Sequence, residues 1–126
     1  MRVFKTKWFA RFARNEGIAD KSLREAIERA EQGLIDADLG GGLIKQRVAR
    51  QGQGRSGGYR TIVAYRAKSR AVFLFGFAKS EQENIEPDEL VFLRRLGENW
   101  LAADTAGIQE ELDAGNVQEI EDDEEA

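Results

Sequence analysis

The sequence predicts an α+β domain in which helices pack on one face of an antiparallel β-sheet of three to four strands. Apolar residues recur at spacings of three and four before residue 34 and again after residue 86, which is the helical period. Between these segments the apolar residues alternate at a spacing of two, the period of strands. The chain has 126 residues, enough for one domain with one compact core.

Two helices are expected near the N-terminus, after a short strand at residues 2–6. The first helix begins at Lys7, and its apolar stripe consists of Trp8, Phe9, Phe12 and Ala13. Gly17 suits the left-handed position that ends such a helix. Asp20 or Ser22 is expected to cap the second helix, and Ser22 with Glu25 has the spacing of a capping box. Gly33 closes this helix, whose core face consists of Leu23, Ala26, Ile27 and Ala30.

Three strands then follow as an antiparallel meander. We expect them at residues 44–49, 59–66 and 70–79, where β-branched and aromatic residues alternate with polar ones. Residues 39–42 form a flexible, glycine-rich approach to the first of these strands. The third strand carries three aromatic residues that we interpret as core, Phe73, Phe75 and Phe77. The sheet face without helices is expected to be open for binding.

The C-terminal third is expected to be helical and then acidic. Pro87 fits the first position of a helix to about residue 103, with one apolar face formed by Leu90, Leu93, Leu96 and Trp100. A shorter helix is expected at residues 106–114, ended by Gly115. Residues 119–125 are nearly all acidic. This tail either stays solvated or folds back onto the basic sheet face as a phosphate mimic.

Charge is divided unevenly along the chain, although the net charge is only −4. Residues 1–79 contain 17 Lys or Arg and 7 Asp or Glu, which gives a net charge of +10. Residues 80–126 contain 2 Lys or Arg and 16 Asp or Glu, which gives a net charge of −14. No acidic residue lies between Leu39 and Ser80, where there are nine basic ones: Lys45, Arg47, Arg50, Arg55, Arg60, Arg66, Lys68, Arg70 and Lys79. This segment favours a polyanionic partner, nucleic acid first. The alternative is that it pairs with the acidic C-terminal third.

The residue types exclude several kinds of site. The chain has no cysteine, which excludes disulfides and thiolate metal sites. It has no histidine, so any catalysis must use Lys, Arg, Tyr, Asp or Glu. No apolar run has transmembrane length, and the N-terminus lacks the features of a secretory signal. We therefore expect a soluble, cytoplasmic protein.

The basic residues of the strands are the candidate binding groups. Lys45 and Arg47 alternate with Ile44, Gln46 and Val48, so both basic side chains leave the same face of the sheet. Arg60 interrupts an apolar strand and has no acidic neighbour in the sequence, which favours binding of an external anion. Tyr59 and Tyr65 have the opposite alternation, and their rings are either core or stacking partners for bases.

The polar loop at residues 51–58 has two interpretations. Its Gly-x-Gly motif lies between two strands rather than before a helix, which excludes a nucleotide-cofactor loop. The loop is then either a flexible hairpin connection or a segment that closes over a phosphate through its backbone amides and Arg55.

Three segments resemble the RelE/HigB toxins of the RelE/ParE superfamily: residues 41–49, residues 52–62 with the motif Gly58-Tyr59-Arg60, and residues 75–79. The similarity extends over about residues 1–103. The resemblance implies a RelE-like fold and the toxin of a type II toxin–antitoxin system, a ribosome-dependent endoribonuclease that cuts mRNA. It also implies a cognate antitoxin, expected to be a helix-turn-helix DNA-binding protein. Residues 1–104 would form the toxin domain, and residues 105–126 a partly disordered acidic C-terminal extension.

The family's pattern places basic residues from two strands and the end of a third around the scissile phosphate. They correspond here to Lys45, Arg47, Arg60 and Lys79, which are the expected catalytic residues. The residues expected to contact RNA are Arg50, Arg55, Tyr59 and Tyr65. Many relatives have an Arg after the closing Lys, where this chain has Ser80, and some use a Tyr or His near the C-terminus, which is absent here. The identity of the general base therefore stays open.

RNA cleavage of this kind uses the 2′-OH of the substrate as the nucleophile. Arginine suits the phosphate because it is always charged and presents a planar fork, and Lys79 is the candidate for proton transfer. No metal and no small-molecule cofactor are expected. Two alternatives stay open: a ParE-like gyrase inhibitor, against which the basic pair Lys45 and Arg47 argues, and an RNA-binding module without catalysis.

Overall fold

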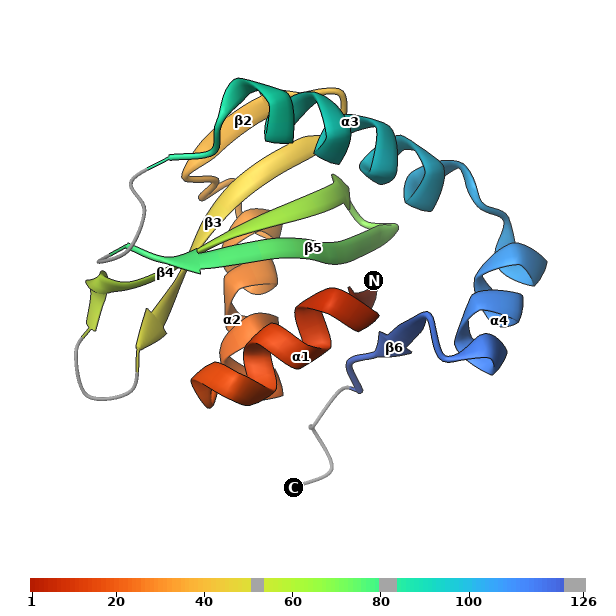
Figure 1. Cartoon of the computed structure of the whole chain (residues 1–126), viewed down its shortest axis with the longest axis horizontal. Helices are drawn as coiled ribbons and strands as arrows, with labels where there is room; N and C mark the ends of the chain where they lie inside the picture. Colours follow the sequence, from red (N-terminus) through yellow and green to blue (C-terminus); the bar gives the residue numbers. More distant parts are fainter. Residues whose placement is uncertain (51–53, 80–83, 122–126) are drawn as a thin grey trace.

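The computed structural model describes residues 1–50, 54–79 and 84–121, and the side chains of these residues except those of 50 and 54–57. Figure 1 shows the elements, which in chain order are β1 (Arg2–Thr6), α1 (Lys7–Glu16), α2 (Asp20–Glu31), β2 (Ala37–Gly40), β3 (Leu43–Arg50), β4 (Gly54–Arg66), β5 (Arg70–Ala78), α3 (Pro87–Ala102), α4 (Thr105–Ala114) and β6 (Val117–Glu119). The predicted α+β class is confirmed.

The strands form one sheet in the order β2-β3-β4-β5-β1-β6. The predicted meander is confirmed, since β3, β4 and β5 pair antiparallel, but β1 joins β5 in parallel. The expectation of three to four strands is wrong, because the described residues form six. The unpredicted strands β2 and β6 have only four and three residues, too few to show a clear alternation.

The glycine-rich segment before β3 is a tight turn of a hairpin, not the flexible approach that we expected. β2 pairs antiparallel with β3, and Gly40 pairs with Leu43. Gly40, Gly41 and Gly42 all have positive φ angles, of 84°, 64° and 83°. Three successive left-handed positions are accessible to glycine at little cost, and they reverse the chain here.

Helices cover both faces of the sheet, so the expectation of one open face is wrong (Figure 1). On one face, α1 and α2 bury residues such as Phe9 and Leu23 against Val63 and Phe73. On the other face, α3 buries Leu93 and Leu101 in a second cluster, whose buried strand residues are Phe4, Leu43, Ile62, Ala64, Val72, Leu74 and Val117. The sheet is therefore the middle layer of three.

The helix ends agree only in part with the predicted caps. Gly17 ends α1 with a φ angle of 71°, and Pro87 begins α3, as predicted. The expected capping box of Ser22 and Glu25 is wrong, because α2 begins two residues earlier at Asp20 and has no side-chain cap. Gly115 ends α4 with a φ angle of 80°, also as predicted.

A β-bulge interrupts the alternation of β5. Ile62 pairs with Phe75 whereas Val63 pairs with Phe73, so β5 has one additional residue at Leu74. As a result Leu74 and Phe75 both belong to the α3 face, while Phe73 lies in the core under α1 and α2. Phe73 is fully buried as expected, but Phe75 is only half-buried.

The segment that follows α3 is part of the fold as far as Ile120. Ile108 of α4 is fully buried in the α3-side cluster, and β6 pairs antiparallel with β1. Glu119 of β6 accepts two hydrogen bonds from the Arg2 guanidinium, each of 2.9 Å. Most of the predicted acidic tail, residues 122–126, lies outside the described residues.

Candidate functional site

The sheet face under α3 changes from apolar to cationic along β3 and β4. The strand pairing defines three cross-strand rows of side chains on this face, each containing one residue from β3, β4 and β5. The first row is Leu43, Ala64 and Val72; the second is Lys45, Ile62 and Phe75; the third is Arg47, Arg60 and Phe77. The first row packs against α3. The cations therefore lie in the two rows toward the β3–β4 hairpin end.

Arg60 is buried although it carries a charge. Its residue is only 8% exposed, and its Nη1 atom is buried with no hydrogen-bond partner among the described residues. Burial, and then the positive charge of Arg47, lowers the pKa of the Arg60 guanidinium, with Asp36 acting in the opposite direction. The group nevertheless stays protonated, as arginine does in proteins. A buried cation without a full set of partners is unfavourable, and an incoming anion would relieve this.

Arg47 lies directly opposite Arg60 on the neighbouring strand and is exposed. Directly opposed residues have Cβ atoms about 5 Å apart, so both guanidinium groups can reach one anion. The Arg47 Nε lies 3.9 Å from Asp36 Oδ1, while the Arg47 backbone N–H donates to Asp36 Oδ2 at 2.6 Å. The long side-chain contact is exposed to solvent and leaves the Arg47 charge largely available.

Lys45 and Lys79 complete the cationic patch, which we define as Lys45, Arg47, Arg60 and Lys79. Lys45 is half-buried, and its Nζ donates to Asn84 Oδ1 at 3.3 Å. Lys79 follows β5 directly and is exposed, and its backbone N–H donates to the carbonyl of Gly58 at 3.2 Å. Lys79 is two positions after Phe77, with only Ala78 between them, so alternation places it on the same face.

The other residues predicted to contact RNA lie elsewhere or beyond the described side chains. Arg50 ends β3 and Arg55 lies near the start of β4, but their side chains are not among those described. Tyr59 and Tyr65 lie on the face covered by α1 and α2, opposite to Arg60.

Neither tyrosine is placed for stacking on a base beside Arg60. Tyr59 is 2% exposed, packs edge-on against Phe12, and donates to Glu16 Oε1 at 3.1 Å. The Tyr65 hydroxyl donates to the Glu31 carboxylate. Burial, and then this carboxylate, raises the pKa of Tyr65 to about 12. Their positions correspond to the core alternative of the sequence analysis.

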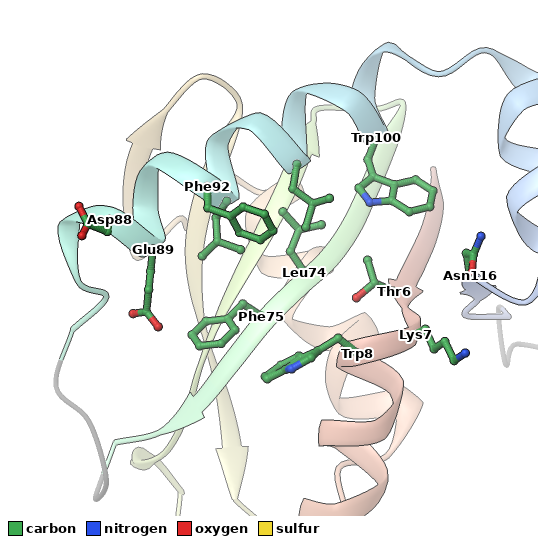
Figure 2. A pocket seen from close by; sticks show the side chains of 12 residues that line it. Thr6, Lys7, Trp8, Leu74, Phe75, Asp88, Glu89, Phe92, Trp100 and Asn116 are labelled. Carbon is green, nitrogen blue, oxygen red and sulfur yellow. The ribbon is translucent and has the colours of Figure 1, made fainter.

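A second feature of the same face is an apolar trough beside the cationic patch, which the sequence analysis missed. It is a cavity of about 640 Å³ between α3 and the start of α1, with β5 as its floor. Figure 2 shows Phe75 on the floor, Phe92 above it on α3, and Trp8 beside it on α1. The Trp8 and Phe75 ring centroids are 4.9 Å apart. Trp8 is 46% exposed, so it does not belong to the predicted core stripe of the first helix.

The trough could have been found from the spacing of residues on α3. Leu93, Gly97 and Leu101 form one stripe at a spacing of four, and all three are buried. Phe92, Leu96 and Trp100 form a second stripe at the same spacing, and they line the trough. Leu93, Leu96 and Trp100 were predicted to share one face, but Leu93 belongs to the first stripe and the other two to the second.

The described residues contain neither a metal-binding cluster nor a membrane-spanning helix. No group of three or more Asp or Glu side chains in the described ranges is arranged to hold a metal ion. No helix within them has the length and apolar character needed to cross a membrane.

Comparison with known proteins places the chain in a family. No curated protein sequence matches it. The family model described as the RelE toxin of the RelE / RelB toxin–antitoxin system matches residues 1–120, which include the sheet, all the described helices and β6. The chain therefore belongs to the RelE toxin family and is the RelE-type toxin of a toxin–antitoxin system.

Proposed function

We propose that this toxin is a ribosome-dependent mRNA endoribonuclease that inhibits translation in the cytoplasm and is neutralised by its cognate antitoxin. The observation that carries the proposal is the pair of opposed arginines, Arg47 and Arg60, in the last row of the sheet. One of their guanidinium nitrogens, Arg60 Nη1, is buried without a partner among the described residues. Two adjacent cations repel each other, so the arrangement is unfavourable unless an anion binds between them.

A phosphodiester is the anion that fits both the site and the family. In the proposed reaction the 2′-oxygen of one nucleotide bonds to the adjacent phosphorus, and the bond from phosphorus to the 5′-oxygen breaks. The 2′-OH loses its proton and the departing 5′-oxygen gains one. The reaction needs no metal, because RNA supplies the nucleophile and the arginines neutralise the phosphate.

The residues of the cationic patch have separate roles in this proposal. Arg60 stabilises the pentavalent phosphate, because it is a buried cation with a nitrogen, Nη1, that has no partner among the described residues. Arg47 and Lys45 bind the same phosphate or its neighbour from β3, on the same face. Lys79 is the candidate for moving a proton. Arg50 and Arg55, near the β3–β4 loop, are proposed to contact the RNA backbone.

Arg60→Ala should lower single-turnover cleavage on mRNA-programmed ribosomes by ~100–1000-fold, corresponding to about 2.7–4 kcal/mol, by analogy with an oxyanion-hole donor. Ribosome binding should change much less, because the lost interaction acts mainly in the transition state. Arg60→Lys should recover little activity, since a point charge cannot replace the planar fork. The matched control is Arg66→Ala, because Arg66 is an exposed arginine at the other end of the same strand.

Three results would contradict the proposal. Cleavage by folded Arg60→Ala at the wild-type rate would make Arg60 a structural residue. Translation arrest with intact mRNA ends would indicate an RNA-binding module without catalysis. Inhibition of DNA supercoiling without mRNA cleavage would indicate a ParE-like gyrase inhibitor.

A further inference from the structure

The outer edge of β3 beside Arg47 is closed by side chains rather than by a strand. The pairing of β2 with β3 begins at Ala37 and Lys45. Two residues farther along β3, the Arg47 N–H donates to the Asp36 carboxylate, and the Arg47 carbonyl accepts from the guanidinium of Arg29 on α2. Asp36 and Arg29 therefore border the cationic patch, although neither was predicted as a site residue.

Both backbone groups of Arg47 point away from β4, toward this edge. A residue placed in this way faces its partner on the neighbouring strand at the short Cα distance of an antiparallel ladder, about 4.5 Å. Arg60 is that partner. The charge of Asp36 reaches Arg60 as well, since it opposes the decrease in the pKa of the Arg60 guanidinium. The carboxylate therefore acts on both arginines that are proposed to hold the phosphate.

The Asp36 carboxylate has one oxygen engaged and one oxygen free. Oδ2 accepts from the Arg47 N–H at 2.6 Å. Oδ1 lies 3.9 Å from Arg47 Nε, beyond hydrogen-bond distance, and no described residue donates to it. The Asp36 N–H donates to the buried Gln46 side chain at 2.8 Å, which anchors the residue. An anchored carboxylate with a free oxygen is suited to accept the proton of a bound hydroxyl group.

A hollow beside this carboxylate has room for a nucleoside. Its volume is about 370 Å³, and it is lined by Arg29, Leu34, Ile35, Asp36 and Arg47. Small-molecule sites are commonly about 300–1,000 Å³. Leu34 is 58% exposed and Ile35 is 37% exposed, so both offer apolar surface on which a nucleobase can rest. The charged groups suit the hydroxyls and the phosphate of the same nucleotide.

We propose that Asp36 is the general base of the cleavage and that the hollow binds the nucleoside whose 2′-OH attacks. This inference rests on the proposed function, because it assigns one of the two proton transfers of that reaction. The 2′-OH gives its proton to Asp36 Oδ1 as the 2′-oxygen bonds to phosphorus. The bond from phosphorus to the 5′-oxygen breaks, and this oxygen takes a proton from the Lys79 ammonium. Exchange with water then restores both side chains.

The order of the strands agrees with this division of roles. Asp36 lies outside β3 and Lys79 follows β5, and the opposed arginines lie between them on β3 and β4. In phosphoryl transfer the attacking and leaving oxygens lie roughly in line on opposite sides of phosphorus. A phosphate held by Arg47 and Arg60 therefore has the base on its attacking side and the acid on its leaving side. Arginine itself cannot be the base, because it stays protonated in proteins.

The first test measures single-turnover cleavage by Asp36→Asn on mRNA-programmed ribosomes. Asparagine keeps an oxygen for the Arg47 N–H but cannot take the proton, so the rate should fall about 100-fold or more. Ribosome binding should not weaken, and Asp36→Glu should recover part of the rate. The matched control is Asp38→Asn, because Asp38 is an exposed carboxylate on β2 that does not line the hollow. Asp38→Asn should cleave like the wild type.

The pH dependence of the rate distinguishes a base from a residue that only positions Arg47. The wild-type rate should fall as the buffer is made more acidic, since a protonated carboxylate cannot accept another proton. Asp36→Asn should lack this fall. The charged groups around Asp36 are Arg29, Arg47 and Arg60, which stay protonated over this range and cannot cause it.

A second test detects the nucleoside subsite without cleavage. The methyl-labelled full-length chain is titrated with ribonucleoside 3′-monophosphates and followed by NMR. The Leu34 and Ile35 methyl signals should shift, whereas those of Val91, an exposed residue of α3 outside the hollow, should not. Leu34→Ala should weaken the binding by about five-fold, because it removes apolar contact with the base. Val91→Ala should bind like the wild type.

Several results would overturn the inference, and they differ in what they overturn. Wild-type cleavage by folded Asp36→Asn would remove Asp36 as the base and leave the nuclease proposal standing. The same loss of rate in acid for Asp36→Asn as for the wild type would make Asp36 a positioning residue only. Unchanged methyl signals of Leu34 and Ile35 would place the nucleoside elsewhere. Intact mRNA with the wild-type chain would instead contradict the proposed function itself, and the base with it.

Discussion

Gln46 shows how a single buried polar side chain holds the edge of the sheet in place. It is fully buried on the face under α1 and α2. Its Nε2 donates to the carbonyls of Ala26 and Leu34 at 2.9 and 3.3 Å, and its Oε1 accepts from the Asp36 N–H at 2.8 Å. Gln46 thus joins β3, α2 and the segment leading into β2. That segment includes Asp36, whose carboxylate contacts Arg47.

Gln46→Leu should lower the free energy of unfolding by about 1–3 kcal/mol, because it removes three hydrogen bonds, one of them to the carbonyl of the buried Ala26. Denaturant unfolding followed by fluorescence gives this value. Gln118→Leu is the control, since Gln118 is an exposed strand residue, and it should change stability by less than about 0.5 kcal/mol. Equal stability of the two variants would mean that water satisfies the groups that Gln46 bonds.

For single residues, the sequence could predict the sheet face on which a side chain lies, but not the contacts that bury it. Alternation correctly placed Lys45 and Arg47 on the same sheet face, and Tyr59 and Tyr65 on the face opposite to Arg60. Alternation assigns a face but not the layer that covers it. The burial of Tyr59 under α1 depends on Phe12 and Glu16, which are more than forty residues away in the chain.

At the scale of elements, long periodic segments were predictable and short or irregular ones were not. α1, α3, β3 and β5 match their predicted positions closely, whereas β4 begins at Gly54, inside the predicted polar loop. The strand β6 has three residues and is specified by its partner rather than by its own pattern, since Thr6 pairs with Val117. The bulge at Leu74 is likewise a property of two strands together. The bulge turns Phe75 toward the trough. The regular spacing of Phe73, Phe75 and Phe77 in the sequence gives no sign of this bulge.

The pairing of β1 with β6 should depend on pH through Glu119. The hydrogen bonds from Arg2 lower the pKa of the Glu119 carboxyl below its usual value of 4.5. A lowered pKa in the folded state contributes stability that is fully present above about pH 4.5 and is lost as the pH falls through the folded value. Glu119→Gln should therefore reduce stability at pH 7, by at most about 1 kcal/mol for this partly exposed pair, and flatten the acid side of the profile.

Thermal unfolding between pH 3 and pH 7 measures this effect. Glu110→Gln, which removes an exposed carboxylate from α4, should leave the shape of the profile unchanged. If Glu119→Gln and the wild type lose stability in parallel toward low pH, the Arg2–Glu119 contact does not hold β6 in solution.

At the scale of the whole molecule, one face of the sheet is closed by core packing and the other carries the exposed candidate binding surfaces. The face under α1 and α2 is closed by a continuous core from Phe9 to Val63. The α3 face is divided into an apolar part under the helix, the trough, and the cationic rows. Charge segregation along the sequence predicted a polyanion site, but not its boundary. That boundary depends on where α3 crosses the strands, which is a tertiary property.

Arg60 and Arg70 are both affected by burial in the same direction, but their hydrogen-bond partners differ. Burial is the largest cause that lowers the pKa of both Arg60 and Arg70. Arg70 Nη1 donates to the carbonyls of Trp100 and Ala103, each at 2.7 Å, and so caps the C-terminus of α3. Arg60 Nη1 has no partner in the described part of the chain. Replacement by methionine, which is flexible and apolar, should therefore have opposite effects at the two positions.

Arg60→Met should raise the free energy of unfolding by an amount on the order of 1 kcal/mol. It removes a buried guanidinium whose Nη1 atom has no partner among the described residues, and it removes the repulsion from Arg47. The proposed cleavage should fall as far as in Arg60→Ala. Arg70→Met should lower the free energy of unfolding by about 1–3 kcal/mol, since two carbonyls at the end of α3 lose their donor. Both values come from denaturant unfolding at one pH and salt concentration. A loss of stability in Arg60→Met as large as that in Arg70→Met would show that Arg60 has protein partners in solution. The buried guanidinium would then stabilise the fold by itself, and no phosphate would be needed to neutralise Arg60 and Arg47.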